Sequence, residues 1–172
     1  MGRNIPISGY LGLAALLGLV LVQSSLGPFL TIFGVHPDLV LVAVISWTIL
    51  RGPAEGLVWA IIGGIGLDLF SGGPFGVMTI ALVITSLLAS LGYGRAFGGY
   101  LILPLALTFP LSLVYYLSYT LFLSVLNEPI AWLLALTSVV LPASVINIVA
   151  MLFLFPPLRL LHRRTGREEI GW

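Results

Sequence analysis

Two carboxylates, Asp38 and Asp68, are the groups in this sequence that most need a chemical explanation, because each stands in or beside a long apolar stretch. An ionisable side chain within a membrane is costly, so each is a candidate functional residue. Each also has a structural interpretation. Asp38 can favour the positive end of a helix dipole at a helix start, and Asp68 can pair with backbone N–H groups of a neighbouring turn.

The other reactive residues do not favour catalysis. His36 and His162 lack a second histidine or a carboxylate at metal-ligand spacing, so no metal site is predicted. No serine has the Gly-x-Ser-x-Gly setting of a hydrolase, and there is no cysteine. The run 63–66 (GGIG) has no following lysine and no preceding strand, so it is not a nucleotide loop. We therefore expect a non-enzymatic protein without a cofactor.

Composition defines the elements that must position these groups. The chain has 172 residues, of which 59% are hydrophobic and 8% charged, with a mean hydropathy of +1.16. This leaves too little polar surface for a water-soluble protein of this size. We predict an all-α membrane protein, one integral membrane domain over 1–172 that forms a compact bundle of six transmembrane helices. The spans are expected at about 9–26, 37–50, 54–70, 75–91, 99–126 and 130–155.

Arginine placement supports six spans. All seven basic residues are arginines, and with six alternating spans the N-terminus, the loops at Arg51 and Arg95, and the C-terminal tail 159–172 share one side. The positive-inside bias then predicts that both termini are cytoplasmic. The tail is expected to face anionic lipid and not nucleic acid, because it is short and carries two glutamates. Its arginines are Arg159, Arg163, Arg164 and Arg167.

The stretch 52–76 combines small residues with one acid. Its small-residue ladder consists of Gly56, Ala60, Gly63, Gly64 and Gly66. Small residues spaced by about four let helix backbones approach closely in lipid. After Asp68, the turn contains Ser71, Gly72, Pro74 and Gly76, so the third and fourth spans are expected to form an antiparallel hairpin.

Three further patterns carry expectations. Pro104, Pro110 and Pro142 are expected sites of kinking, and the sixth span is expected to end before the pair at 156–157. Arg51 and Glu55 are four residues apart and can form an ion pair at the membrane interface. An aromatic stripe on the fifth span is typical of packing or lipid contact, with pocket lining as the alternative. It consists of Tyr115, Tyr116, Tyr119 and Phe122.

Several short motifs in order resemble the family of the bacterial rod shape-determining protein MreD. They are 23–25 (QSS), 37–39 (PDL), 51–53 (RGP) with Gly56, 63–69 (GGIGLDL) and 71–76 (SGGPFG). The resemblance covers about 23–76, and the small, multi-span layout agrees over the rest. It implies a non-enzymatic component of the bacterial inner membrane that acts in lateral peptidoglycan synthesis. The implied partners are MreC and, through it, MreB and the synthase formed by RodA and a class B penicillin-binding protein. The resemblance also implies a bundle similar to the substrate-binding subunits of energy-coupling-factor transporters.

Two hypotheses follow from these observations. The first is a membrane scaffold that docks the MreC membrane helix and its adjacent extracytoplasmic segment on the ladder of the third span, beside Asp68 and the Ser71 turn. The alternative is a substrate-binding membrane subunit of a vitamin-type transporter, with an outward pocket. That pocket would use Asp38, Asp68, Asn127, Glu128 and the tyrosines of the fifth span.

Overall fold

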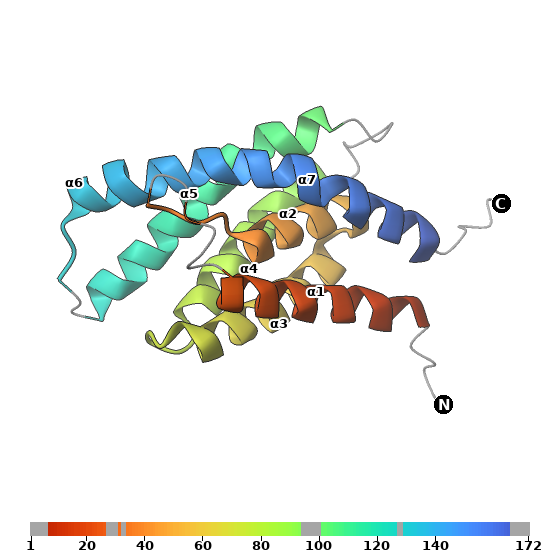
Figure 1. The fold of residues 1–172 in the computed structure, drawn as a ribbon, viewed down its shortest axis with the longest axis horizontal. Helices are drawn as coiled ribbons and strands as arrows, with labels where there is room; N and C mark the ends of the chain where they lie inside the picture. The colour runs from red at the N-terminus through yellow and green to blue at the C-terminus, as the bar shows by residue number, and fades with distance from the viewer. Residues whose placement is uncertain (1–6, 27–30, 32–33, 94–100, 127–128, 166–172) are drawn as a thin grey trace.

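The computed structural model describes residues 7–26, 31, 34–93, 101–126 and 129–165. Its elements there are helices, and they form one bundle (Figure 1). They are α1 (Ile7–Leu26), α2 (Leu39–Arg51), α3 (Pro53–Ser71), α4 (Val77–Ala89), α5 (Ile102–Val125), α6 (Trp132–Ala135) and α7 (Leu141–Thr165). A π-helical turn joins α6 to α7, so the last two form one continuous rod. The prediction of an all-α protein with six helices is confirmed.

The six rods differ in length. By length and composition, three helices of the described residues can cross a membrane: α3, α5 and the rod Trp132–Arg164. The apolar segments Leu39–Arg51 and Val77–Gly92 are shorter, whereas α1, with 20 residues, contains the apolar segment Leu11–Ser25. The chain is thus a membrane protein whose long helices accompany short ones.

The short helix α2 lies at the centre of the bundle. Every residue from Val40 to Ile49 is buried, and α1, α3, α4, α5 and α7 all pack against it. A helix that is apolar on all sides is stable only when it is enclosed. Thirteen residues reach about 20 Å, less than a bilayer core of about 30 Å. Because protein surrounds α2, the bilayer does not determine its length.

Helices α3 and α4 form a tight antiparallel hairpin. Gly72 ends α3 in the left-handed conformation at φ 67°, and Gly76 precedes α4 at φ 94°. Both values favour glycine, which has no Cβ to clash. Pro53 occupies the first turn of α3, where its missing N–H costs no helical hydrogen bond.

The small-residue ladder of α3 packs inside this chain. A Cβ added to Gly56 would overlap the Thr48 side chain of α2, and one added to Gly64 would overlap the Cα of Thr79 in α4. At Gly63 the added Cβ would lie 2.9 Å from Val40 of α2, and at Gly66 it would lie 2.9 Å from Val20 of α1. Ala60 is fully buried. The ladder therefore brings α1, α2 and α4 close to α3.

The sixth rod differs from its expected end. The sequence places the end of this helix before Pro156, but α7 continues through Pro156 and Pro157 to Thr165. Both prolines are exposed, whereas Phe155 and Leu158 are buried against the core. Packing of the buried side therefore holds the helix together across residues that would otherwise end it.

Two further features of the sixth rod concern its arginines and its π turn. Arg159, Arg163 and Arg164 lie on the last turns of α7 and not in a separate tail, while Arg167 is outside the described residues. The π turn Leu136–Val140 comes directly before α7, in which Pro142 is the second residue. Such turns accommodate local misfits in helices.

The end of the bundle that carries arginines is polar and aromatic. The start of α1 and the end of α7 lie at this same end (Figure 1). The predicted ion pair is confirmed, with 3.6 Å between Arg51 Nη1 and Glu55 Oε1. Trp47 stacks on Trp59 with ring centroids 4.2 Å apart, and its indole N–H donates to Glu55. We call this the arginine end.

Candidate functional site

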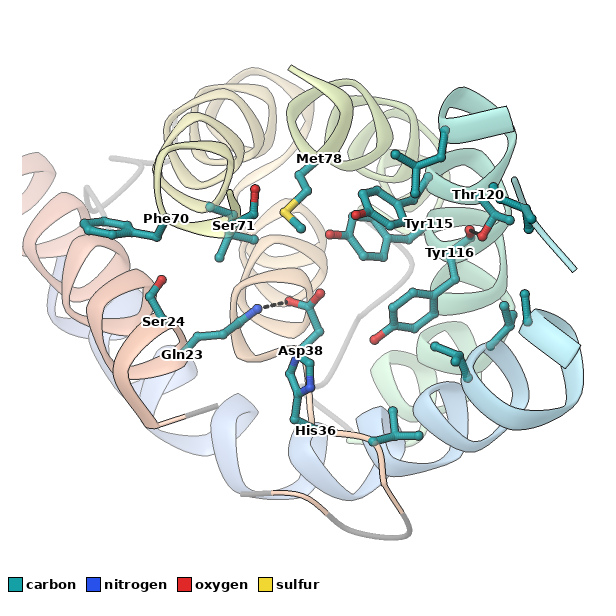
Figure 2. A pocket seen from close by; sticks show the side chains of 18 residues that line it. Gln23, Ser24, His36, Asp38, Phe70, Ser71, Met78, Tyr115, Tyr116 and Thr120 are labelled. Carbon is teal, nitrogen blue, oxygen red and sulfur yellow. Dashed lines mark hydrogen bonds between the residues drawn. The ribbon is translucent and has the colours of Figure 1, made fainter. Parts of the chain in front are cut away.

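A cavity of about 440 Å³ opens among the helices at the end opposite the arginine end. The ends of α1, α3 and α5 and the starts of α2 and α4 surround it, and the rod of α6 and α7 closes one side (Figure 2). Most of its surface is apolar, and its polar groups include Gln23, His36, Asp38 and three tyrosines. This volume lies within the usual range of small-molecule pockets, about 300–1,000 Å³.

Asp38 has the structural role expected at a helix start, and it also lines the cavity. It is the N-cap of α2, and its Oδ1 accepts a hydrogen bond of 3.0 Å from the backbone N–H of Leu41. The amide of Gln23 in α1 donates to the same oxygen at 3.0 Å, and its own carbonyl oxygen accepts from the backbone N–H of Val40 at 2.8 Å. Asp38 is 6% exposed and lines the cavity. Gln23 therefore fixes the end of α1 against the start of α2.

Asn147 of α7 completes a buried polar network beside the cavity. Its side-chain oxygen accepts from the backbone N–H of Asp38 at 2.8 Å. Its amide nitrogen donates to Ser112 Oγ at 3.2 Å and to the Tyr116 hydroxyl at 3.3 Å, both in α5. One fully buried side chain thus connects α2, α5 and α7. A satisfied network of this kind specifies how helices pack, because a broken one leaves buried polar groups unpaired.

The tyrosines of α5 face the cavity. Tyr115, Tyr116 and Tyr119 line it, and the rings of Tyr115 and Tyr116 meet edge to face with centroids 5.1 Å apart. Figure 2 shows the Tyr116 hydroxyl directed toward the side where Asp38 and His36 lie. Of the two interpretations of the aromatic stripe, pocket lining therefore holds for these three tyrosines. Phe122, the fourth member of the stripe, is not among the lining residues.

Asp68 is held by the start of α4. Its Oδ1 accepts from the backbone N–H of Met78 at 3.0 Å, and its Oδ2 accepts from the N–H of Thr79 at 3.1 Å and from the Thr79 hydroxyl at 2.6 Å. The residue is 4% exposed and is not among the residues that line the cavity. The carboxylate thus satisfies free N–H groups at the positive end of α4, across the hairpin from its own helix.

The turn between these helices supports that contact. The Ser71 hydroxyl donates to the Asp68 carbonyl oxygen at 3.2 Å and accepts from the Gly73 N–H at 3.2 Å. Ser71 also lines the cavity, while Gly72, Pro74 and Gly76 form the rest of the turn.

The structure separates residues that the sequence grouped into one pocket. It brings Asp38 and the three tyrosines together, and it places Asp68 outside the lining. Asn127 and Glu128, which completed the expected pocket, lie outside the described residues. Among the described residues, no three His, Cys, Asp or Glu side chains form a group that could hold a metal ion.

Sequence reasoning missed the connecting roles of Gln23 and Asn147. Gln23 entered only as part of a family motif, and Asn147 was not considered. Each is an amide side chain in an apolar helical stretch. Such residues in apolar helices typically hydrogen-bond across helix interfaces, and that signal was available.

Apolar helices around a partly polar cavity define a multi-pass membrane protein. The chain belongs to the family described as rod shape-determining protein MreD, whose profile matches residues 7–165. This family is a non-enzymatic determinant of cell shape in the bacterial cell membrane. No curated protein and no solved structure matches the chain significantly.

Proposed function

We propose that this protein is a membrane scaffold of the cell-elongation machinery, which docks MreC and through it connects to MreB, RodA and a class B penicillin-binding protein. Membership of the MreD family is the observation that carries the proposal. The bundle itself agrees with it, because the described connections between α2 and α3 and between α3 and α4 are only one and five residues long. A protein with so little surface at these connections offers mainly its membrane-facing helices to a partner.

The proposed orientation puts the arginine end in the cytoplasm. Arg159, Arg163 and Arg164 then face anionic lipid headgroups at that side, and the ion-paired Arg51 lies at the same side, as the positive-inside bias favours. The cavity opens toward the extracytoplasmic side. The whole chain, 1–172, acts as one membrane domain that resembles the substrate-binding subunits of energy-coupling-factor transporters.

The ladder of α3 fixes the fold in this proposal and does not receive the partner helix. Its glycines already contact α1, α2 and α4. The opposite side of α3 carries exposed large apolar residues at helical spacing, namely Val58, Ile61, Ile65 and Leu69. We place the MreC helix on this side, where it would end beside exposed Phe70 and Phe75 at the hairpin.

Site-specific photocrosslinking tests this placement. A photoreactive amino acid at Ile65 or Leu69 is expected to crosslink MreC. The same amino acid at Leu117 or Leu121, which are exposed on α5, serves as the matched control and is expected to give no adduct. Crosslinks from α5 alone would contradict the placement on α3.

The cavity favours a second candidate function, a substrate-binding subunit for a small molecule. Mass spectrometry of the protein purified from membranes separates the two candidates. A retained metabolite that exchanges with added ligand supports transport, whereas stabilisation by MreC without any retained metabolite supports the scaffold.

A further inference from the structure

The lining of the cavity has an unbalanced charge. Asp38 is its carboxylate, and the lining contains neither arginine nor lysine. His36 is the basic side chain there, and it is exposed. Gln23 and the Leu41 N–H both donate to Oδ1 of the Asp38 carboxylate, and the Tyr115 hydroxyl also lies within hydrogen-bond reach of this carboxylate. Figure 2 shows the second oxygen turned toward the tyrosine side of the cavity. A carboxylate can accept further hydrogen bonds there, so this end suits a cation.

Aromatic rings flank the same space. Tyr115, Tyr116 and Tyr119 of α5 line it, whereas Figure 2 shows the Phe70 ring, at the end of α3, directed away from Asp38. The face of an aromatic ring attracts cations, and groups of such rings bind organic ammonium ions. Organic ammonium groups gain from both features at once, because the carboxylate offsets their charge and the rings contact their carbon atoms.

The remainder of the lining is aliphatic. Leu67, Met78, Leu123, Val139 and Val140 supply apolar contacts around the polar end. A ligand with a charged head and an apolar body would therefore match both parts of the cavity. A small metal ion would match less well, since no group of metal ligands exists among the described residues.

We propose that the cavity binds an organic ammonium group attached to an apolar body, with the ammonium beside Asp38 and the tyrosines. The proposal goes beyond the scaffold function and names the ligand class for the second candidate. The ammonium is supplied either by a free amine or by the headgroup of an aminophospholipid, which share this chemistry.

Calorimetric titration of the full-length protein in detergent tests the proposal. The probe is benzyltrimethylammonium, and the matched compound is neopentylbenzene, which has the same shape without the charge. We expect saturable binding of the cation that is at least about tenfold tighter than binding of the neutral compound. Equal affinity for the two compounds, or no binding of the cation, would overturn the proposal.

Variants locate the site. Asp38→Asn removes the charge but keeps a side-chain oxygen that can accept from the Leu41 N–H, so asparagine remains a good N-cap. It is expected to weaken cation binding about tenfold or more and to leave binding of neopentylbenzene unchanged. Tyr119→Leu, outside the described hydrogen-bond network, is expected to weaken cation binding as well. Tyr93→Leu is the control, because Tyr93 is exposed at the other end of α4.

Three further measurements complete the test. The thermal unfolding midpoint of each variant separates loss of the site from loss of the fold, and Tyr119→Leu decides the matter if Asp38→Asn unfolds. Vesicles with phosphatidylethanolamine that compete with the probe, where phosphatidylglycerol vesicles do not, identify a lipid headgroup. Absence of competition identifies a free amine.

MreC capture by the same variants is expected to be unchanged, so failure of the scaffold proposal would be visible separately. Unchanged cation affinity in both folded variants would contradict the assignment to this cavity.

Discussion

Removal of the Asp68 carboxylate is expected to destabilise the hairpin of α3 and α4. The Asp68 carboxylate accepts three hydrogen bonds, and Asp68→Ala removes this acceptor. The backbone N–H groups of Met78 and Thr79 then lose their hydrogen-bond partner. Hydrogen bonds to a charged group contribute about 1.5–3 kcal/mol each. The Thr79 hydroxyl can rotate to another acceptor, and the N–H groups are only partly buried, so a cost near the low end, about 3–5 kcal/mol, is expected.

Conservative variants divide that cost. Asp68→Asn keeps one acceptor oxygen and loses the charge at the start of α4, so it is expected to cost about 1–3 kcal/mol. Thr79→Val removes only the hydroxyl donor and is expected to cost about 1 kcal/mol. Ser71→Ala removes the turn hydroxyl and serves as the control for disturbance of the turn alone.

Equilibrium unfolding of the purified chain in mixed detergent micelles, followed by circular dichroism, measures these differences. MreC capture by the same proteins, at a temperature where each is folded, distinguishes the two roles of Asp68. We expect reduced stability and retained capture. An Asp68→Ala protein with the unfolding free energy of the unaltered chain would refute the fold-fixing role, and loss of capture at unchanged stability would assign Asp68 to the partner.

Three other substitutions test the packing. Gly64→Leu is expected to prevent the close approach of α3 to Thr79 and to yield aggregated protein in size-exclusion chromatography; a monodisperse product would contradict the tight hairpin. Asn147→Ala leaves the Asp38 N–H without its acceptor and is expected to cost about 1–3 kcal/mol by detergent unfolding, whereas no change would show the network to be dispensable. Pro157→Ala is expected to raise the thermal midpoint, since proline costs about 3 kcal/mol inside a helix; a lower midpoint would show that α7 requires the proline.

The sequence predicted the elements of this fold well, because their signals are local. Apolar runs mark the helices, and the glycines and prolines at 51–53 and 72–76 mark the breaks between them, where Gly72 ends α3 with a positive φ. The predicted end of the sixth helix was wrong because it, too, relied on a local signal. Proline pairs predict a helix end by local conformation, but burial of Leu158 beyond the pair depends on other helices and decides the outcome.

The candidate site was less predictable, because it depends on which helices become neighbours. A glycine ladder predicts close approach of another helix without stating whether that helix belongs to the same chain. Asp68 was a candidate site residue because it follows the glycine ladder in the sequence. The acid that lines the cavity is instead Asp38, whose only sequence signal was its position at a helix start. Asn147 is 109 residues from Asp38, and no local pattern connects two such residues.

Co-purification with MreC tests the proposed scaffold role most directly. The full-length chain and MreC, expressed together and solubilised in mild detergent, are expected to co-elute as one complex, with a higher thermal midpoint than either protein alone. The photocrosslinks from α3 should appear in that same complex. Separate elution of two folded proteins, with no change in either midpoint, would contradict the proposal that this membrane bundle docks MreC.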